Sequence, residues 1–314
     1  AVKNINEIVK KNIEGKNFDS YEKFDDFLLN LDGTDNKSKL GANTILACSM
    51  TFLKCLAKNN GQEIYQFLNK NEEFMLPAPL MNIINGGAHA NNGLDIQEFM
   101  IVPAGFDSFS ESLRAGVEIF HNLKDLLNKN SHSTAVGDEG GFAPDLKSNE
   151  EALSFISEAV SNAGYKLGSE VYFALDVAAT EIYKNKKYRI DKKDLNVEEI
   201  SIYYQKLIDK YPIISIEDPL DEDDWDGWAM LTNLVGDKVQ LVGDDLFVTN
   251  NSRLQTGIDK SAGNSILIKI NQIGSISETL QAIDLAKKNN YSYIISHRSG
   301  ETEDAIIADI SVAT

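Results

Sequence analysis

Seven short apolar runs, separated by amphipathic stretches with helical spacing, constrain the fold of residues 80–314 more than any other feature. The runs are LMNIIN, QEFMIVP, VYFALD, PIISIED, VQLVGD, SILIKI and YSYIISH. Continuous apolar strands are typical of a parallel sheet covered by helices on both faces. Repetition of the strand–helix unit favours a (β/α) barrel over a doubly wound sheet. The sequence also has no GxGxxG motif, so nothing in it supports a dinucleotide site.

Polar, helical patterns fill the first 76 residues, which contain no convincing strand. Apolar residues recur at helical spacing in AVKNINEIVKKNI, FDSYEKFDDFLLNLDG, NKSKLGANTILACSMTFLKCLAKNNG and EIYQFLNK. Gly33 and an Asn-Asn-Gly sequence are helix stop signals. Pro77 and Pro79 then interrupt the pattern. We therefore predict a mostly helical domain over residues 1–76 and the barrel over residues 77–314.

The charge of the chain excludes several kinds of partner. Its 30 basic and 48 acidic residues give a net charge of −18, which repels nucleic acids and anionic membranes where no basic patch exists. No uncharged run reaches membrane-spanning length. Cys48 and Cys55 lie seven residues apart in a predicted helix, too far to form a disulfide. We expect two reduced, packed thiols in a cytosolic protein.

Ionisable residues end five successive apolar runs of the predicted barrel. The carboxyl ends of barrel strands meet at one mouth, where active sites form. A single charged residue at a strand end is usually only the start of a solvated loop, but five in series favour a functional site. These residues are Asp176, Glu217, Asp244, Lys269 and His297.

Three of these residues, Asp176, Glu217 and Asp244, bring carboxylates to the predicted mouth. Ligands that are all oxygen suit a hard cation, with Mg²⁺ favoured over Ca²⁺ or Mn²⁺. Zinc more often takes His or Cys, and the chain has only four His. Lys269 has two interpretations: it balances the carboxylates as a structural ion pair, or it is a base whose pKa is lowered by burial and a nearby cation.

Glycine-rich loops supply further polar candidates. Glycine allows the backbone to approach a small ligand closely, although GDEGG alone is equally typical of an ordinary turn. An Arg beside a Ser, directly after a strand, suits a phosphate group. The candidates are His89, Gln97 and Glu98 in INGGAHANNGLDIQEF, Glu139 in AVGDEGGFAP, and Arg298 and Ser299 in SHRSGETED.

Eight motifs together resemble the enolase family. In chain order they are LDGTDNKSKLGAN, NIINGGAHANN, QEFMIVP, HSTAVGDEGGFAP, SIEDPLDEDDW, VGDDLFVTN, LIKINQIG and SHRSGETEDAIIAD. The resemblance covers the whole chain in one register, and it is to enolase proper rather than to the racemases and lactonising enzymes that share its barrel. It implies an α/β fold, in which an enolase-type (β/α)8 barrel with an antiparallel second strand follows the helical part of a smaller α+β domain.

The resemblance also implies an activity: reversible dehydration of 2-phosphoglycerate to phosphoenolpyruvate in glycolysis and gluconeogenesis, with two Mg²⁺ per site. It further implies a cytoplasmic homodimer or higher homo-oligomer. Lys269 resembles the base that removes the C2 proton. Glu139 resembles the acid that protonates the departing C3 hydroxyl, with Glu98 nearby. His89 and His297 resemble further active-site positions.

The remaining candidates resemble ligand-binding residues of the family. Three carboxylates resemble the ligands of the tighter Mg²⁺, and three other residues resemble substrate contacts, two of them at the phosphate. The first set is Asp176, Glu217 and Asp244, and the second is Gln97 together with Arg298 and Ser299 at the phosphate.

Both ends of the sequence look cut. The chain has no initiator Met, and the family resemblance leads us to expect an N-terminal sheet, a serine-containing loop and a last barrel strand with a second lysine beyond its ends. Two hypotheses therefore stand. The first is an enolase that is active as a full-length protein, and the second is a catalytically silent enolase-like protein or fragment with a structural or binding role.

Overall fold

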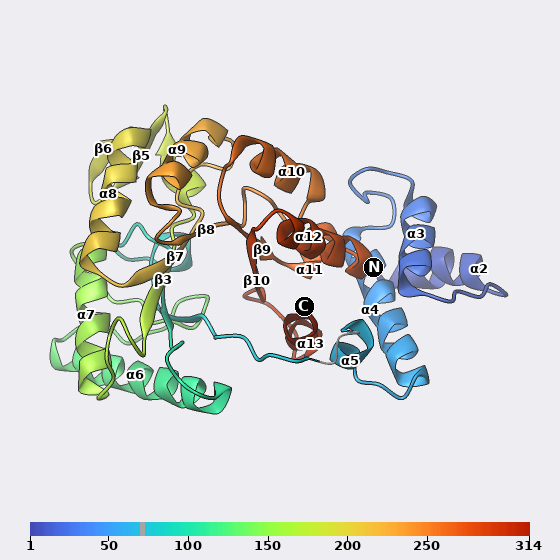
Figure 1. Cartoon of the computed structure of the whole chain (residues 1–314), viewed down its shortest axis with the longest axis horizontal. Coiled ribbons are helices and arrows are strands. Elements are labelled where there is room, and N and C mark those ends of the chain that lie inside the picture. Colours follow the sequence, from blue (N-terminus) through green and yellow to red (C-terminus); the bar gives the residue numbers. More distant parts are fainter. Residues whose placement is uncertain (70–72) are drawn as a thin grey trace. The chain divides into compact units, whose positions relative to one another are not determined.

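The computed structural model describes residues 1–69 and 73–314, and the chain divides into two compact units (Figure 1). The first unit contains Ala1–Leu76, Phe247–Thr256 and Ile266–Thr314, and the second contains Pro77–Leu246 and Gly257–Ser265. Most of the candidate site residues belong to the second unit, whereas Lys269 and the residues after it belong to the first.

Helices form the N-terminal part of the first unit, as the sequence predicts. The Ser20 hydroxyl accepts a hydrogen bond from the Lys23 amide at the start of α3, and Gly33, with a φ of +69°, ends this helix. Among the described residues of 1–76 there is no strand. The elements are α1 (Val2–Asn4), a π-helical segment (Ile5–Val9), α2 (Lys10–Ile13), α3 (Tyr21–Asp32), α4 (Ala42–Asn59) and α5 (Ile64–Leu68).

An aromatic and aliphatic core joins these helices. Phe24 of α3 and Ile45 of α4 are buried in it, and the Phe24 ring stacks on Phe52 at a centroid distance of 4.3 Å. Both cysteines are free; Cys48 is half-buried against this core, whereas Cys55 is exposed. The prediction that both thiols are packed is therefore wrong for Cys55, which lies on the solvent side of α4.

Two of the predicted strands belong to the C-terminal part of the first unit. They are neighbours, because the Ser296 amide, directly after the second strand, donates a hydrogen bond of 2.9 Å to the Ile268 carbonyl at the end of the first. Buried Asp25 accepts a hydrogen bond of 2.9 Å from the Ser277 amide and so ties α3 to the start of α12. The elements are β9 (Ser265–Ile268), α11 (Ile270–Ile273), α12 (Ile276–Lys288), β10 (Ser292–Ile295) and α13 (Ile306–Ala313).

Five strands of the second unit lie in the order β1-β2-β3-β7-β8. β2 is antiparallel to both β1 and β3, whereas β3–β7 and β7–β8 are parallel pairs. The predicted antiparallel second strand is thus confirmed. The strands are β1 (Met81–Asn85), β2 (Glu98–Val102), β3 (Tyr172–Asp176), β7 (Ile213–Glu217) and β8 (Gln240–Gly243).

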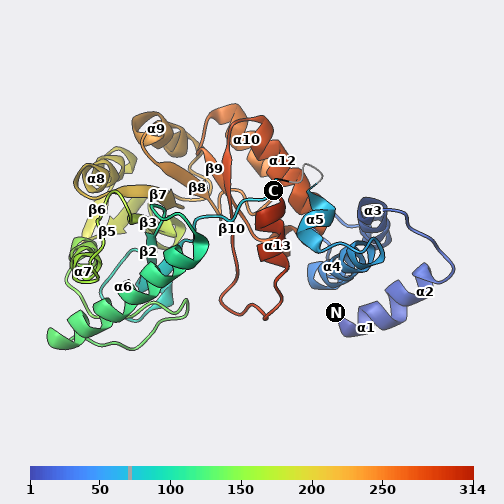
Figure 2. The same cartoon turned by 60° about the horizontal axis from the view of Figure 1, so that its bottom comes forward.

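Capped helices follow these strands. Ser108 and Ser148 accept hydrogen bonds at the starts of α6 and α7, and Asp224 does the same for α9. In Figure 2, α6 and α7 contact each other, and α8 contacts β7. No helix in the described part of the chain is long and apolar enough to cross a bilayer. The helices are α6 (Phe109–Lys129), α7 (Asn149–Asn162), α8 (Val197–Lys210), α9 (Trp225–Val235) and α10 (Asn251–Lys260).

A small antiparallel sheet in the second unit is not predicted by the sequence. Its strands are β4 (Tyr183–Lys184), β5 (Lys187–Ile190) and β6 (Lys193–Leu195), which are too short and too polar to stand out. Asp191 and Lys192 form the turn between β5 and β6 with φ of +46° and +63°, as expected for a two-residue hairpin. The turn presents the Asp191 side chain at the tip of this hairpin.

Candidate active site

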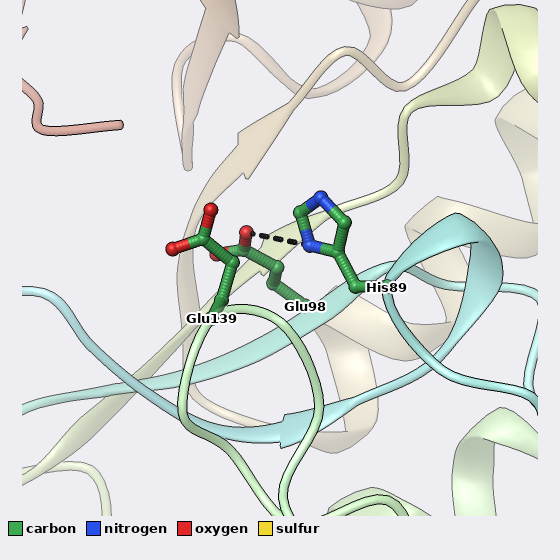
Figure 3. A group of neighbouring side chains, drawn as sticks. All are labelled: His89, Glu98 and Glu139. Carbon is green, nitrogen blue, oxygen red and sulfur yellow. Dashed lines mark ion pairs between the residues drawn. The ribbon is translucent and has the colours of Figure 1, made fainter. Parts of the chain in front are cut away.

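Three polar side chains of the second unit, His89, Glu98 and Glu139, converge in one group (Figure 3). His89 is the last residue of a 3-10 turn, Gly87–His89, that follows β1. Glu98 begins β2, and Glu139 lies in the GDEGG loop. His89 Nδ1 lies 3.2 Å from Glu98 Oε1, and both side chains are largely buried. The interaction with Glu98 raises the pKa of His89, although burial opposes this effect.

Glycines bring the two loops of this group together. A Cβ at Gly137 would lie 2.6 Å from the His89 carbonyl oxygen, and one at Gly141 would lie 2.9 Å from the backbone of Ile84. The Asp138 amide donates a hydrogen bond of 3.2 Å to the same His89 carbonyl. Gly137 and Gly141 of GDEGG are therefore required for close packing against β1 and its loop, and this packing carries Glu139 to His89 and Glu98.

Strand register places the predicted carboxylates in a row. Glu98 pairs with Asp176 across β2–β3, and Asp176 pairs with Glu217 across β3–β7. Glu217 pairs with Val242 across β7–β8, so Asp244 lies two residues beyond that pair. The structure thus brings Asp176, Glu217 and Asp244 to the same end of neighbouring parallel strands, as their positions in the sequence predict.

Asp176 connects this row with the group around Glu98. The Gln97 amide nitrogen Nε2 donates a hydrogen bond of 2.9 Å to Asp176 Oδ2, and the Gln97 backbone amide donates to the Asp176 carbonyl at 3.0 Å. Burial and the charges of Glu98 and Asp244 raise the pKa of Asp176 to about 7. The row is therefore crowded with negative charge that a bound cation would neutralise.

Asp218 is part of the site but is not singled out by the sequence analysis. Oxygens of Glu217, Asp218 and Asp244 lie within 4.8 Å of one another. The buried Asp218 carboxylate accepts hydrogen bonds from the Asp244 amide at 3.0 Å and the Asp245 amide at 2.8 Å. Both of its oxygens thus hold the turn after β8, which makes Asp218 a positioning residue. The sequence feature that could have identified Asp218 is its position directly after Glu217, which makes it a second acidic residue at the end of the same strand.

Four candidates belong to the first unit, whereas the carboxylate row belongs to the second. Lys269 is half-buried between β9 and α11, and its backbone amide donates a hydrogen bond of 2.9 Å to the Thr249 hydroxyl. His297, Arg298 and Ser299 lie in an exposed turn after β10. The structure places these residues at the strand ends that the sequence predicts, and their roles stay predictions.

The fold and the site together define the class of protein: an α/β protein with carboxylates at the ends of parallel strands. Residues 73–314 match the family described as the C-terminal TIM barrel domain of enolase, and residues 1–68 match the family described as the N-terminal domain of enolase. The chain belongs to the enolase family. Its fold class is accordingly an α/β TIM barrel domain preceded by an N-terminal domain, as predicted.

Proposed function

We propose that the full-length protein catalyses the reversible dehydration of 2-phosphoglycerate to phosphoenolpyruvate. The observation that supports this best is the Gln97–Asp176 hydrogen bond, which joins the His89–Glu98–Glu139 group to the carboxylate row. Groups that can transfer protons and groups that can hold a cation therefore share one end of the sheet. A dehydration next to a carboxylate requires both, because it moves protons and builds negative charge.

The acidic row fits a hard divalent cation. Its donors are all carboxylate oxygens, and crowding and burial raise the pKa of Asp176, a cost that a cation would remove. We propose that Asp176, Glu217 and Asp244 hold Mg²⁺, with two ions per site expected from the family. When bound, Mg²⁺ supplies positive charge that stabilises the charge developing on the substrate carboxylate.

The remaining steps are proton transfers and substrate contacts by the chain's own residues. In the proposal, Lys269 removes the proton from C2, and Glu139 protonates the hydroxyl that leaves C3. Glu98 lies close to Glu139, and its ion pair with His89 holds its position. We assign His297 to the active site as well.

Substrate binding in this proposal uses side chains on both glycine-rich and strand-end loops. Gln97 and His89 contact the substrate, and Arg298 and Ser299 contact its phosphate, for which a guanidinium group is well suited. We further propose, from the family alone, that the protein is a cytoplasmic glycolytic homodimer.

The test is phosphoenolpyruvate formation, followed by ultraviolet absorbance, with the full-length protein, 2-phosphoglycerate and Mg²⁺. Turnover by the wild type that is lost in Lys269→Ala and in Glu139→Gln supports the proposal. Absence of turnover in a folded wild-type protein would instead favour a catalytically silent enolase-like protein with a binding role.

A further inference from the structure

A partly buried polar network anchors the backbone just before Gln97 and Glu98. The Asn149 carbonyl oxygen Oδ1 accepts hydrogen bonds from the amides of Asp95 and Ile96, both at 3.2 Å. Asn149 is the first residue of α7 and is completely buried. The segment that leads into β2 is therefore held by a side chain from a helix that begins more than fifty residues later in the chain.

The tip of the β5–β6 hairpin also holds this segment. The Asp191 amide donates a hydrogen bond of 2.7 Å to Asp95 Oδ2. The Asp191 carboxylate in turn accepts from Asn149 Nδ2 at 3.1 Å and from the Tyr203 hydroxyl at 2.9 Å. Asp95, Asn149, Asp191 and Tyr203 thus form one closed network, which we call the hairpin network.

The network lies two residues from the proposed active site. Gln97 follows Asp95 by two positions and bonds Asp176, and Glu98 begins β2 and pairs with His89. A shift of the backbone at Asp95 must be passed to Gln97 and Glu98, because no glycine separates them and β2 is paired on both edges. A small displacement of a reacting group is enough to slow catalysis strongly.

We propose that the hairpin network positions Gln97 and Glu98 for the reaction, so that Asn149, Asp191 and Tyr203 are positioning residues of the active site. This inference rests on the proposed function for its kinetic consequence, although the positioning itself is a property of the fold. It assigns a role to the β4–β6 sheet, which otherwise carries none of the candidate site residues.

Tyr203→Phe in the full-length protein tests this inference, because it removes only one hydroxyl. That hydroxyl donates to Asp191 Oδ2 at 2.9 Å and accepts a longer hydrogen bond from Asn149 Nδ2 at 3.4 Å. The matched control is Tyr211→Phe. The Tyr211 hydroxyl bonds Ser154 at 3.2 Å, and Ser154 belongs to α7, the helix that also contains Asn149, but this bond does not involve Asp191. Asp191→Asn is the second variant: Asn tolerates the left-handed turn and keeps the backbone bond to Asp95, but it loses one acceptor oxygen.

Two measurements are compared with the control. Amide exchange at residues 95–98 should be about fivefold faster in Tyr203→Phe and Asp191→Asn, as expected for the loss of one hydrogen bond. The kcat for phosphoenolpyruvate formation should fall between about tenfold and a hundredfold with a smaller change in KM. Tyr211→Phe should change neither.

The exchange measurement separates failure of this inference from failure of the proposed function. Faster exchange at residues 95–98 in a protein without enolase activity would support the positioning and contradict the function. Exchange and kcat equal to those of Tyr211→Phe in both variants would overturn the inference, whatever reaction the protein catalyses.

Discussion

Replacing Asp176 with Asn should stabilise the metal-free protein at neutral and alkaline pH. Burial and the charges of Glu98 and Asp244 raise the pKa of Asp176 from 3.8 to about 7. Below the lower value the carboxyl is protonated in both the folded and the unfolded chain. Between the two values only the unfolded chain is ionised, so the free energy of unfolding falls as pH rises. Above the higher value the full cost of burying the charge is present.

The magnitude follows from the two pKa values. Each unit of difference between the folded and unfolded pKa corresponds to about 1.4 kcal/mol. The cost of the buried charge above about pH 7 is therefore about 4 kcal/mol. An Asn side chain is neutral at every pH, and Gln97 can turn its amide to pair with it. The advantage of Asp176→Asn should therefore grow by about 3 kcal/mol between about pH 5 and about pH 8.

Urea unfolding in EDTA, followed by tryptophan fluorescence across this pH range, measures the effect. Asp107→Asn is the control, because it makes the same chemical change at an exposed carboxyl outside the site. Saturating Mg²⁺ should stabilise the wild type more than Asp176→Asn, because binding favours the ionised carboxylates. A stability difference between Asp176→Asn and the wild type that does not vary with pH would refute the reasoning.

Three further predictions concern the proposed reaction. EDTA should abolish turnover of the full-length protein and added Mg²⁺ should restore it, while calorimetry should show weaker Mg²⁺ binding by Asp244→Asn; undiminished turnover in chelator would contradict the metal assignment. Lys269→Ala should lose exchange of the C2 proton with deuterated solvent, whereas Glu139→Gln should lose dehydration and retain some exchange. In each variant kcat should fall at least about 10²-fold. The reverse pattern of exchange and dehydration would mean that acid and base are interchanged. Asp218→Asn should weaken Mg²⁺ binding by about tenfold to a hundredfold, because one backbone amide at the end of β8 loses its acceptor; unchanged affinity in a titration would remove its positioning role.

The strands and their ends were predictable because each carries a strong local signal. Apolar runs such as VYFALD and PIISIED are bounded by ionisable residues, and the structure places strands β3 and β7 there. Helix stops were equally clear, as Gly33 shows. These features depend on a few consecutive residues, so a single sequence is sufficient to find them.

The supporting contacts were not predictable for the opposite reason. Asp218 bonds the turn after β8, and Asp191 bonds Asp95, which is 96 positions away in the chain. Such contacts depend on tertiary packing, and an Asp that accepts backbone hydrogen bonds looks like any surface Asp in the sequence. The β4–β6 sheet was missed because its strands of two to four residues lack an apolar run.

The position of Glu98 at the start of the antiparallel strand β2 limits the insertions and deletions that this part of the chain can tolerate. Glu98 faces the site from the first position of a strand that is paired on both edges, opposite Asn85 and Asp176. Inserting or deleting one residue within Glu98–Val102 would reverse the faces of the side chains on one side of the change relative to those on the other, so that Glu98 and the buried residues after it would no longer both keep their faces. Natural length variation should therefore be absent from β2.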